Sequence, residues 1–224
     1  MIKGLIWDMG GVIINFDANI TNRLLSEDCG RSPEEVNALL YGGSAAGREY
    51  NAGLISDYYL GETDSEGFYF HVAQALQLNM SRERFEAVWK ATLTTPNIEV
   101  VDLIHRLHRR YQQCILSSTN PWQLERMNEF TTIGGKIDLQ TLLGDDRMVT
   151  TYKVHDKKPS KRLFRAACAV LGLEKELCVY IDDVKKYTDA AKKFGLQAVH
   201  VDITKPDFIN RCLDDLVALG INVS

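Results

Sequence analysis

The stretch that decides the fold is Lys3–Val12, which reads KGLIWDMGGV. Its first half, Gly4–Trp7, is short and apolar, as expected for a β-strand that is buried on both faces of a parallel sheet. Asp8 follows directly, at the carboxyl end of the strand, where ligands bind in open α/β sheets. Gly10 and Gly11 then allow a sharp turn and a close approach of the backbone to a ligand. The pattern indicates a reaction centre at Asp8, although an acid in this position can also cap a helix or hold a turn.

Two later apolar runs, Cys114–Leu116 and Cys178–Ile181, are also predicted to be strands that end in polar residues. Hydroxyl and amide groups that suit a phosphate follow the first run: Ser117, Ser118, Thr119 and Asn120. The second run stops at a pair of carboxylates that suits a cation: Asp182 and Asp183. Between the two runs, Lys158-Pro159 precedes a predicted helix over residues 160–171. These segments strengthen the interpretation of Asp8 as a reaction centre.

From residue 96 onward, helical and strand-like segments alternate along the chain. Helices are predicted over residues 98–111, 122–130, 160–171 and 187–194, and strands over residues 114–116, 178–181 and 198–201. Strands that alternate with helices usually pair in parallel. We therefore predict an α/β fold in which a parallel sheet is flanked by helices.

The segment before this alternating region, about residues 19–89, contains few strand-like runs and several helical ones. Ser32 and Glu35 form a capping box with Pro33 at the first helical position. Ser81 begins another helix in a similar way. The segment is therefore predicted to be a helical insertion.

Taken in order, the motifs of the chain resemble those of the haloacid dehalogenase superfamily of aspartate-nucleophile phosphohydrolases. The resemblance covers nearly the whole chain and rests on these segments: Asp8–Val12, Ser117, Lys158-Pro159 and Asp182-Asp183. Asn51–Ser56 and Leu116–Asn120 further resemble the subgroup that contains bacterial glucose-1-phosphate phosphatases with small helical caps. This resemblance implies a Rossmann-like core built from residues 1–16 and 92–224, and a C1-type α-helical cap built from residues 17–91.

The resemblance also implies a Mg²⁺-dependent phosphatase in which Asp8 attacks phosphorus and forms an aspartyl-phosphate. Mg²⁺ would be held by the following groups: Asp8, the backbone carbonyl of Gly10, Asp182 and Asp183. Lys158 would add a second positive charge, and Ser117 would donate a hydrogen bond to the transferring group. The implied substrate contacts are Gly11, Ser118, Thr119 and Asn120. Four further residues lie where similar caps face the site: Arg48, Glu49, Tyr50 and Asn51.

The chain departs from most phosphatases of this superfamily at Gly10, where they carry an Asp that acts as general acid and base. General acid or base catalysis contributes roughly 10² to 10⁴ in rate, so the hydrolysis of alkyl phosphates should suffer most. A sugar 1-phosphate has a better leaving group and fits this departure. Water, a cap residue or Asp17 could relay the proton instead.

A second departure follows Asp183, where two amide side chains of the subgroup are replaced by Val184 and Tyr187. Such neighbours orient metal ligands, and their loss costs about 10- to 100-fold in metal affinity or activity. Weaker metal binding is therefore expected. Asp189 could act as a distal acid, but we favour its interpretation as a helix-surface residue.

Two function classes remain. The first is a phosphatase that acts on a small phosphorylated metabolite such as a sugar phosphate. The second is a catalytically impaired phosphate-binding or regulatory protein, which Gly10, Val184 and Tyr187 would explain. A 2-haloacid dehalogenase with the same nucleophile is less favoured, because that reaction needs no Mg²⁺ and the chain retains Asp182 and Asp183.

The composition agrees with a soluble enzyme. With 224 residues, 45% of them hydrophobic and 25% charged, the chain can bury a full core. A formal net charge of -4, with lysines only in isolated pairs, argues against a nucleic-acid partner. Five cysteines without a Cys-x-x-Cys pair indicate reduced thiols, and no apolar run suggests a signal sequence or a membrane span. We expect a cytoplasmic protein without a membrane partner, and the oligomeric state is left open.

Overall fold

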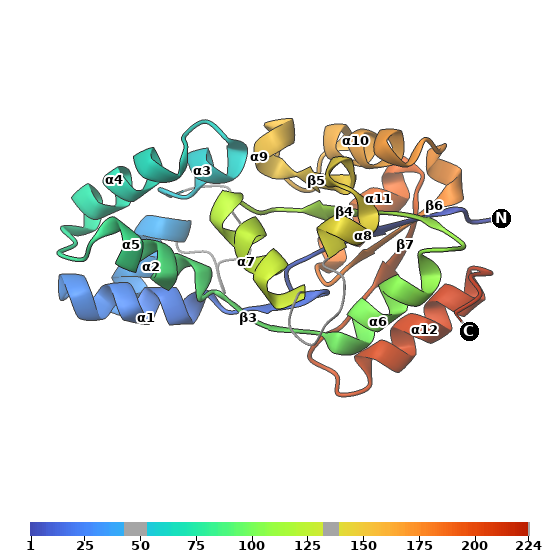
Figure 1. The fold of residues 1–224 in the computed structure, drawn as a ribbon, viewed down its shortest axis with the longest axis horizontal. Coiled ribbons are helices and arrows are strands. Elements are labelled where there is room, and N and C mark those ends of the chain that lie inside the picture. The colour runs from blue at the N-terminus through green and yellow to red at the C-terminus, as the bar shows by residue number, and fades with distance from the viewer. Residues whose placement is uncertain (43–52, 132–138, 224) are drawn as a thin grey trace.

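The computed structural model describes residues 1–42, 53–131 and 139–223. Its centre is a five-stranded sheet in the order β5-β4-β1-β6-β7, in which all neighbouring strands are parallel (Figure 1). The strands are β1 (Gly4–Trp7), β4 (Gln112–Ser117), β5 (Met148–Thr150), β6 (Cys178–Asp182) and β7 (Gln197–His200). The predicted parallel α/β fold is confirmed.

The register of the three central strands aligns their polar ends. Trp7 of β1 lies opposite Ile115 of β4 and opposite Ile181 of β6. One position further along the chain, Asp8 is therefore level with Asp182, and the end of β4 lies on the other side of β1. Because the strands are parallel, these carboxyl ends meet at one edge of the sheet.

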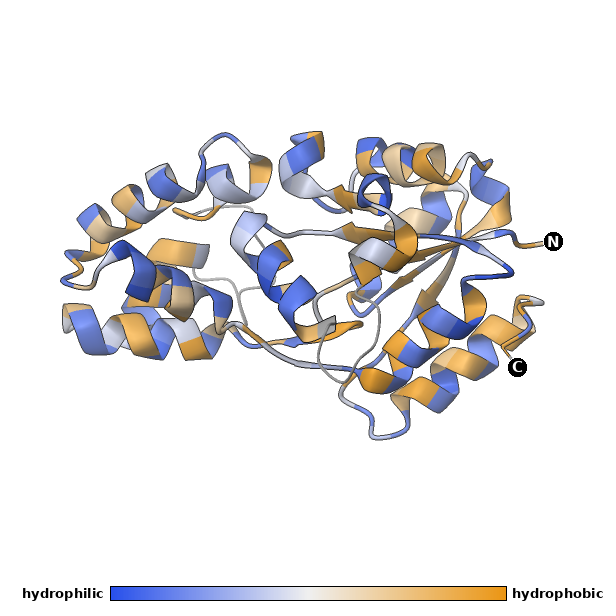
Figure 2. Cartoon of the chain, viewed as in Figure 1, coloured by the Kyte–Doolittle hydropathy of each residue, from blue (hydrophilic) through white to orange (hydrophobic). Residues whose placement is uncertain are grey.

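Helices cover both faces of the sheet, as the continuous apolar strands predict. Leu5 and Trp7 point to the face that packs against α6 (Ile98–Leu107) and α12 (Phe208–Ala218). Ile6 points to the opposite face, which packs against α10 (Lys161–Leu171) and α11 (Lys185–Phe194). Figure 2 shows hydrophobic strands between helices that carry hydrophobic and hydrophilic residues in turn. This is the pattern of a sheet buried on both faces.

Some elements were not predicted. The edge strand β5 has only three residues, which is too short for a period to be recognised. The N-cap residue of α12, Asp207, makes no side-chain capping bond, so the start signal of this helix is weak. Short helical segments α8 (Leu139–Leu143) and α9 (Thr151–Val154) flank β5.

In the described residues, the predicted insertion contains five helices, which lie beside the sheet rather than on its faces (Figure 1). They are α1 (Ala18–Cys29), α2 (Pro33–Tyr41), α3 (Ser56–Leu60), α4 (Ser65–Leu76) and α5 (Arg82–Lys90). Two antiparallel strands, β2 (Ile14–Phe16) and β3 (Leu93–Pro96), connect this insertion to the sheet. The capping box at Ser32 is confirmed, and the Ser81 side chain accepts a hydrogen bond from the backbone of Arg84.

The insertion has a hydrophobic core of its own, and a residue from outside it completes that core. Trp122 lies in α7 (Pro121–Thr131), which follows β4, and it is 2% exposed. Its ring lies 5.7 Å from the ring of Tyr58 and 6.0 Å from that of Phe85. The insertion is therefore packed onto α7. None of the helices in the described part of the chain is long and apolar enough to cross a membrane.

Replacing Trp122 by Ala is expected to lower the free energy of unfolding by about 3 to 5 kcal/mol, because it removes a buried ring shared by the insertion and α7. Urea unfolding followed by circular dichroism measures the change. Trp122→Phe keeps an aromatic ring and should lose much less. An unchanged urea midpoint in Trp122→Ala would show that the insertion does not depend on α7.

Candidate active site

Asp8 lies at the centre of the edge where the strands end. Its backbone N–H donates to the carbonyl of Ile181 at 2.8 Å, which continues the pairing of β1 with β6 beyond Trp7. The residue is 6% exposed, so its carboxylate is almost fully removed from bulk water. The strand pairing and the burial fix the position of this carboxylate.

Lys158 bridges two carboxylates across the sheet edge. Its Nζ donates to Asp8 Oδ1 at 2.6 Å and to Asp182 Oδ2 at 3.0 Å. The hydroxyl of Tyr180 donates to the same oxygen of Asp182. Lys158 precedes α10, whose first turn is capped by the Ser160 hydroxyl, and it is 6% exposed. The sequence separation is 150 residues, and the fold brings the ammonium group directly onto Asp8.

Burial sets the protonation behaviour of this pair. Desolvation raises the pKa of Asp8 to about 8, and the nearby charges of Asp182 and Asp183 act in the same direction, although Lys158 opposes them. Burial alone would lower the pKa of Lys158, but Asp182 and Asp8 outweigh it and raise that pKa. Lys158 therefore stays charged, and the site lacks enough positive charge to hold all its carboxylates ionised.

Three carboxylates converge at this edge. One oxygen each from Asp8, Asp182 and Asp183 lie within 4.8 Å of one another. Hard divalent cations such as Mg²⁺ take oxygen ligands of this kind, and a cation would supply the missing positive charge. The donor set therefore fits Mg²⁺.

The two neighbouring acids of this set differ in their surroundings. Asp182 is fully buried, and its Oδ1 accepts the backbone N–H of Val184 at 2.7 Å while its Oδ2 holds Lys158 and Tyr180. Asp183 is half-buried and lines the pocket in front of Asp8. Asp182 thus positions Lys158, and Asp183 is the one of the two that faces the pocket.

Gly11 lies against Asp183. Its backbone has a φ of +93°, and a Cβ at this position would collide with the Asp183 carboxylate. Its N–H donates to the carbonyl of Ile14 at 2.7 Å, which closes the turn after β1. The structure therefore gives Gly11 a role in making room for Asp183, and its predicted contact with substrate stays a prediction.

Gly11→Ala is expected to weaken Mg²⁺ binding by about 10-fold or more, because the new methyl group must displace Asp183. Calorimetric titration with Mg²⁺ measures the effect. Gly30→Ala is the matched control, since Gly30 also has a positive φ of +71° but has nothing within 4 Å of the place that a Cβ would take. Equal Mg²⁺ affinity in Gly11→Ala and the native chain would contradict this role of Gly11.

The loop Ser117–Asn120, hereafter the 117–120 loop, joins β4 to α7. Ser118 lines the pocket, whereas Ser117 is 1% exposed and both Thr119 and Asn120 are fully buried. The carboxamide oxygen of Asn120 accepts the backbone N–H of Gln123 at 3.1 Å, as a helix N-cap does. Ser118 thus shares the pocket with Asp8, and the contacts of all four residues with a substrate stay predictions.

The pocket in front of Asp8 also contains residues that the sequence did not single out. It is lined by Asp8, Met9, Gly10, Phe16, Leu93, Ser118, Gln123, Lys158, Asp183, Val184 and Tyr187. Phe16 and Leu93 come from the two connecting strands, and Gln123 from the first turn of α7. Their positions depend on how the insertion joins the core, for which the sequence offers no periodic signal. The position of Gln123, three residues after Asn120 at the end of the polar 117–120 loop, was the available hint.

The remaining candidates lie elsewhere. Asp17 caps α1 by accepting the backbone N–H of Asn19 at 2.9 Å. Asp189 pairs with Lys185 at 2.7 Å on an exposed helix surface, which agrees with the favoured interpretation. Residues 48–51 lie outside the described residues.

A family model described as haloacid dehalogenase-like hydrolase matches residues 2–195. The chain belongs to this family of hydrolases. This hydrolase is similar to a D-ribitol-5-phosphate phosphatase of Bacteroides thetaiotaomicron, with 19% identity over 204 aligned residues. The alignment covers 88% of this chain and 90% of the relative. The family resemblance inferred from the sequence motifs is confirmed.

Solved structures share the fold of this chain. The hydrolase superposes on a haloacid dehalogenase family enzyme of Bacteroides thetaiotaomicron, in complex with magnesium and inorganic phosphate, with a TM-score of 0.74 and 18% identity over 92% of this chain and 96% of the other. It superposes on a predicted hydrolase of the family from Porphyromonas gingivalis with a TM-score of 0.79 and 20% identity over 95% and 98% of the two chains.

Proposed function

We propose that this hydrolase is a Mg²⁺-dependent phosphatase that acts on a small phosphorylated metabolite through an aspartyl-phosphate at Asp8. The observation that carries the proposal is the Lys158 bridge between Asp8 and Asp182, at a pocket edge where Asp183 adds a third carboxylate. A buried carboxylate suited to act as nucleophile, an ammonium group and a set of carboxylate oxygens suited to a cation therefore lie close together, which supports the proposal. Each of these is needed when an anion attacks a phosphoryl group.

In this mechanism a carboxylate oxygen of Asp8 attacks phosphorus, and the bond from phosphorus to the leaving-group oxygen breaks. Water then attacks the aspartyl-phosphate, which releases inorganic phosphate and restores Asp8. Lys158 keeps Asp8 oriented and places its charge beside the phosphoryl oxygens, since it is held on its other side by Asp182. Ser118 of the 117–120 loop lines the same pocket as Asp8 and is suited to donate a hydrogen bond to a phosphoryl oxygen. Bound Mg²⁺ would neutralise charge in both half-reactions, held by Asp8, Asp183 and the carbonyl of Gly10.

A sugar or polyol phosphate is the substrate class that we propose. The similarity to a D-ribitol-5-phosphate phosphatase over 88% of the chain supports it. Among these esters, the absence of a carboxyl at Gly10, in a pocket lined by Phe16 and Leu93, favours those with a better leaving group, such as anomeric phosphates, over alkyl esters such as polyol phosphates. The three clustered carboxylates favour this function over dehalogenation, which requires no cation.

The test is the release of phosphate from p-nitrophenyl phosphate and from a panel of sugar and polyol phosphates, with Mg²⁺ or with EDTA. We expect Mg²⁺-dependent turnover, faster for aryl and anomeric phosphates than for alkyl phosphates. Turnover that persists in EDTA would contradict the role of the cation.

A catalytically impaired phosphate-binding protein is the second candidate, which Gly10, Val184 and Tyr187 at the pocket favour. Calorimetry with inorganic phosphate and Mg²⁺ separates it from the first. Phosphate binding without turnover of any ester would establish this second function instead.

A further inference from the structure

The side chain of Gln123 makes hydrogen bonds to three other segments of the chain at the wall of the pocket. It is 2% exposed, and its Oε1 accepts the hydroxyl of Tyr59 at 2.8 Å and that of Thr119 at 3.4 Å. Its Nε2 donates to the hydroxyl of Thr92 at 3.1 Å. Tyr59 belongs to the insertion, Thr92 precedes the connecting strand β3, and Thr119 belongs to the 117–120 loop. These hydrogen bonds are made by the buried amide of a residue that also lines the pocket in front of Asp8.

The neighbours of Gln123 determine which way its amide points. The hydroxyl of Thr92 donates its proton to the carbonyl of Trp89 at 2.9 Å, so it must accept from Gln123. The nitrogen of the amide therefore faces Thr92, and its oxygen faces Tyr59 and Thr119. Each of these groups is buried, and removal of the Thr92 hydroxyl would cost the buried amide nitrogen this hydrogen bond.

Thr92 also joins the two connections between the insertion and the sheet. Its carbonyl accepts the backbone N–H of Asp17 at 2.8 Å, and Asp17 directly follows β2. Gln123 is therefore hydrogen-bonded to the connections through Thr92 and to α3 of the insertion through Tyr59. Its position depends on how the insertion lies against the core.

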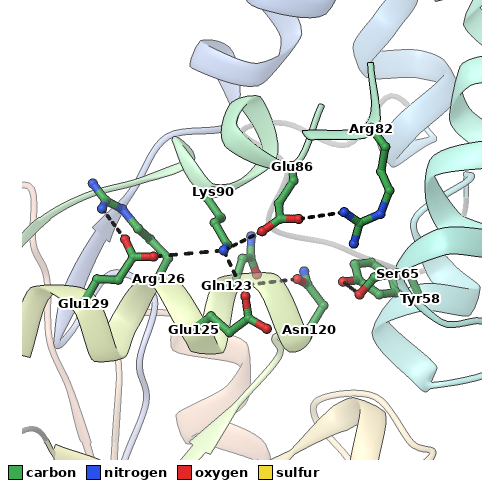
Figure 3. A network of polar contacts seen from close by, with 10 residues as sticks. All are labelled: Tyr58, Ser65, Arg82, Glu86, Lys90, Asn120, Gln123, Glu125, Arg126 and Glu129. Atoms are coloured by element: carbon green, nitrogen blue, oxygen red, sulfur yellow. Dashed lines mark hydrogen bonds and ion pairs between the residues drawn. The ribbon is translucent and has the colours of Figure 1, made fainter. Parts of the chain in front are cut away.

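Ion pairs link the outer side of α7 to the insertion. Figure 3 shows Lys90 of α5 between Glu86 of its own helix and two acids of α7. Its Nζ lies 2.7 Å from Glu86, 2.9 Å from Glu125 and 4.0 Å from Glu129. Together with Trp122, this bridge holds the insertion against the same helix that carries Gln123 in its first turn.

We propose that Gln123 is a positioning residue for phosphoryl transfer, which holds the 117–120 loop in its reactive geometry when the insertion is seated on α7. The inference rests on the proposed phosphatase function. Thr119 is the contact through which Gln123 acts on the loop, and Asn120 is held by the backbone of Gln123. The insertion thereby influences the phosphoryl site itself, even for a substrate that does not touch the insertion.

The experiment measures kcat and KM with acetyl phosphate, whose leaving group is small and needs no proton. Gln123→Met keeps the length of the side chain and removes its hydrogen bonds. A displacement of reacting groups by about 1 Å costs roughly 100-fold, so we expect kcat to fall by about 10- to 100-fold with little change in KM. Thr92→Val should act in the same direction, whereas Thr92→Ser keeps the hydroxyl and should restore a near-native kcat.

The outcomes are distinct. A native kcat in folded Gln123→Met would overturn the inference, and so would a change confined to KM for sugar phosphates, which would mean that Gln123 only contacts the leaving group. If Gln123→Met does not fold, the variants Tyr59→Phe and Thr92→Val test the inference in its place. A native kcat in both of these variants would overturn the inference. Failure of the proposed function would be visible earlier, as no phosphate release by the native chain.

Discussion

Replacing Asp8 by Asn is expected to reduce Mg²⁺-dependent phosphate release from p-nitrophenyl phosphate by about 10⁴- to 10⁶-fold, in the range seen when an enzyme loses its nucleophile. Asn has the same size and keeps an oxygen that can accept the hydrogen bond of Lys158. Its amide cannot form the covalent phosphoryl intermediate, and it removes one negative charge from the three-carboxylate cluster. Steady-state kinetics with saturating Mg²⁺ measures the loss.

The loss should not come from unfolding. Burial raises the pKa of Asp8 from 3.8 to about 8, so between these pH values its carboxyl keeps a proton in the folded chain and ionises in the unfolded chain. The unfolded state then binds fewer protons, and this residue makes stability fall as the pH rises through that range. A neutral Asn avoids the cost, so the variant in EDTA at pH 7 should unfold at a temperature no lower than the native chain does.

Asp189→Asn is the matched control for this experiment. It makes the same chemical change at a carboxylate that pairs with Lys185 on the surface. Native activity is expected, because an exposed ion pair contributes little. Retention of activity in Asp8→Asn to within about tenfold would exclude Asp8 as the nucleophile, since the loss of a nucleophile costs several orders of magnitude in kcat.

The strands and the position of Asp8 could be predicted because a strand buried on both faces leaves a continuous apolar run in the sequence. β1 and β6 are such runs, and each ends at an acid. Parallel pairing then brings these ends together without any further information. The predicted residues Asp8, Lys158 and Asp182 are accordingly in direct contact.

The division of roles between Asp182 and Asp183 could not be predicted in this way. It depends on Tyr180 and Val184, which occupy the oxygens of Asp182, and on Gly11, which leaves space for Asp183. These are contacts between side chains and backbone at a turn, and no periodic pattern records them.

The contacts between the insertion and the core could not be predicted from the sequence for a similar reason. Trp122 and Gln123 are neighbours on one helix of the core, yet one fills the hydrophobic core of the insertion and the other lines the pocket. Their partners Tyr58 and Tyr59 are more than 60 residues away. Helical spacing predicts which residues share a face, but the partner of that face depends on how two separately folded layers meet.

Gly10→Asp is expected to raise kcat/KM for alkyl phosphates by about 10² to 10⁴, because it supplies an acid that can protonate the leaving group. The backbone can accept the change. The φ angle of Gly10 is not in the left-handed region, and the nearest atom to a Cβ there is the Cβ of Phe16, at 3.9 Å. The same residue lines the pocket beside Asp8, so the new carboxyl would face the leaving group.

The pattern across substrates distinguishes this gain from a general improvement of the site. p-Nitrophenol departs as an anion, so its ester should gain little, and the dependence of log kcat/KM on the leaving-group pKa should become flatter. Gly10→Asn has a similar size but no proton to donate, and it should show no such flattening. If both variants lose activity equally on every ester, the space at Gly10 is needed for substrate itself. The glycine would then select substrates by shape, whereas a gain confined to Gly10→Asp means that it selects them by leaving group.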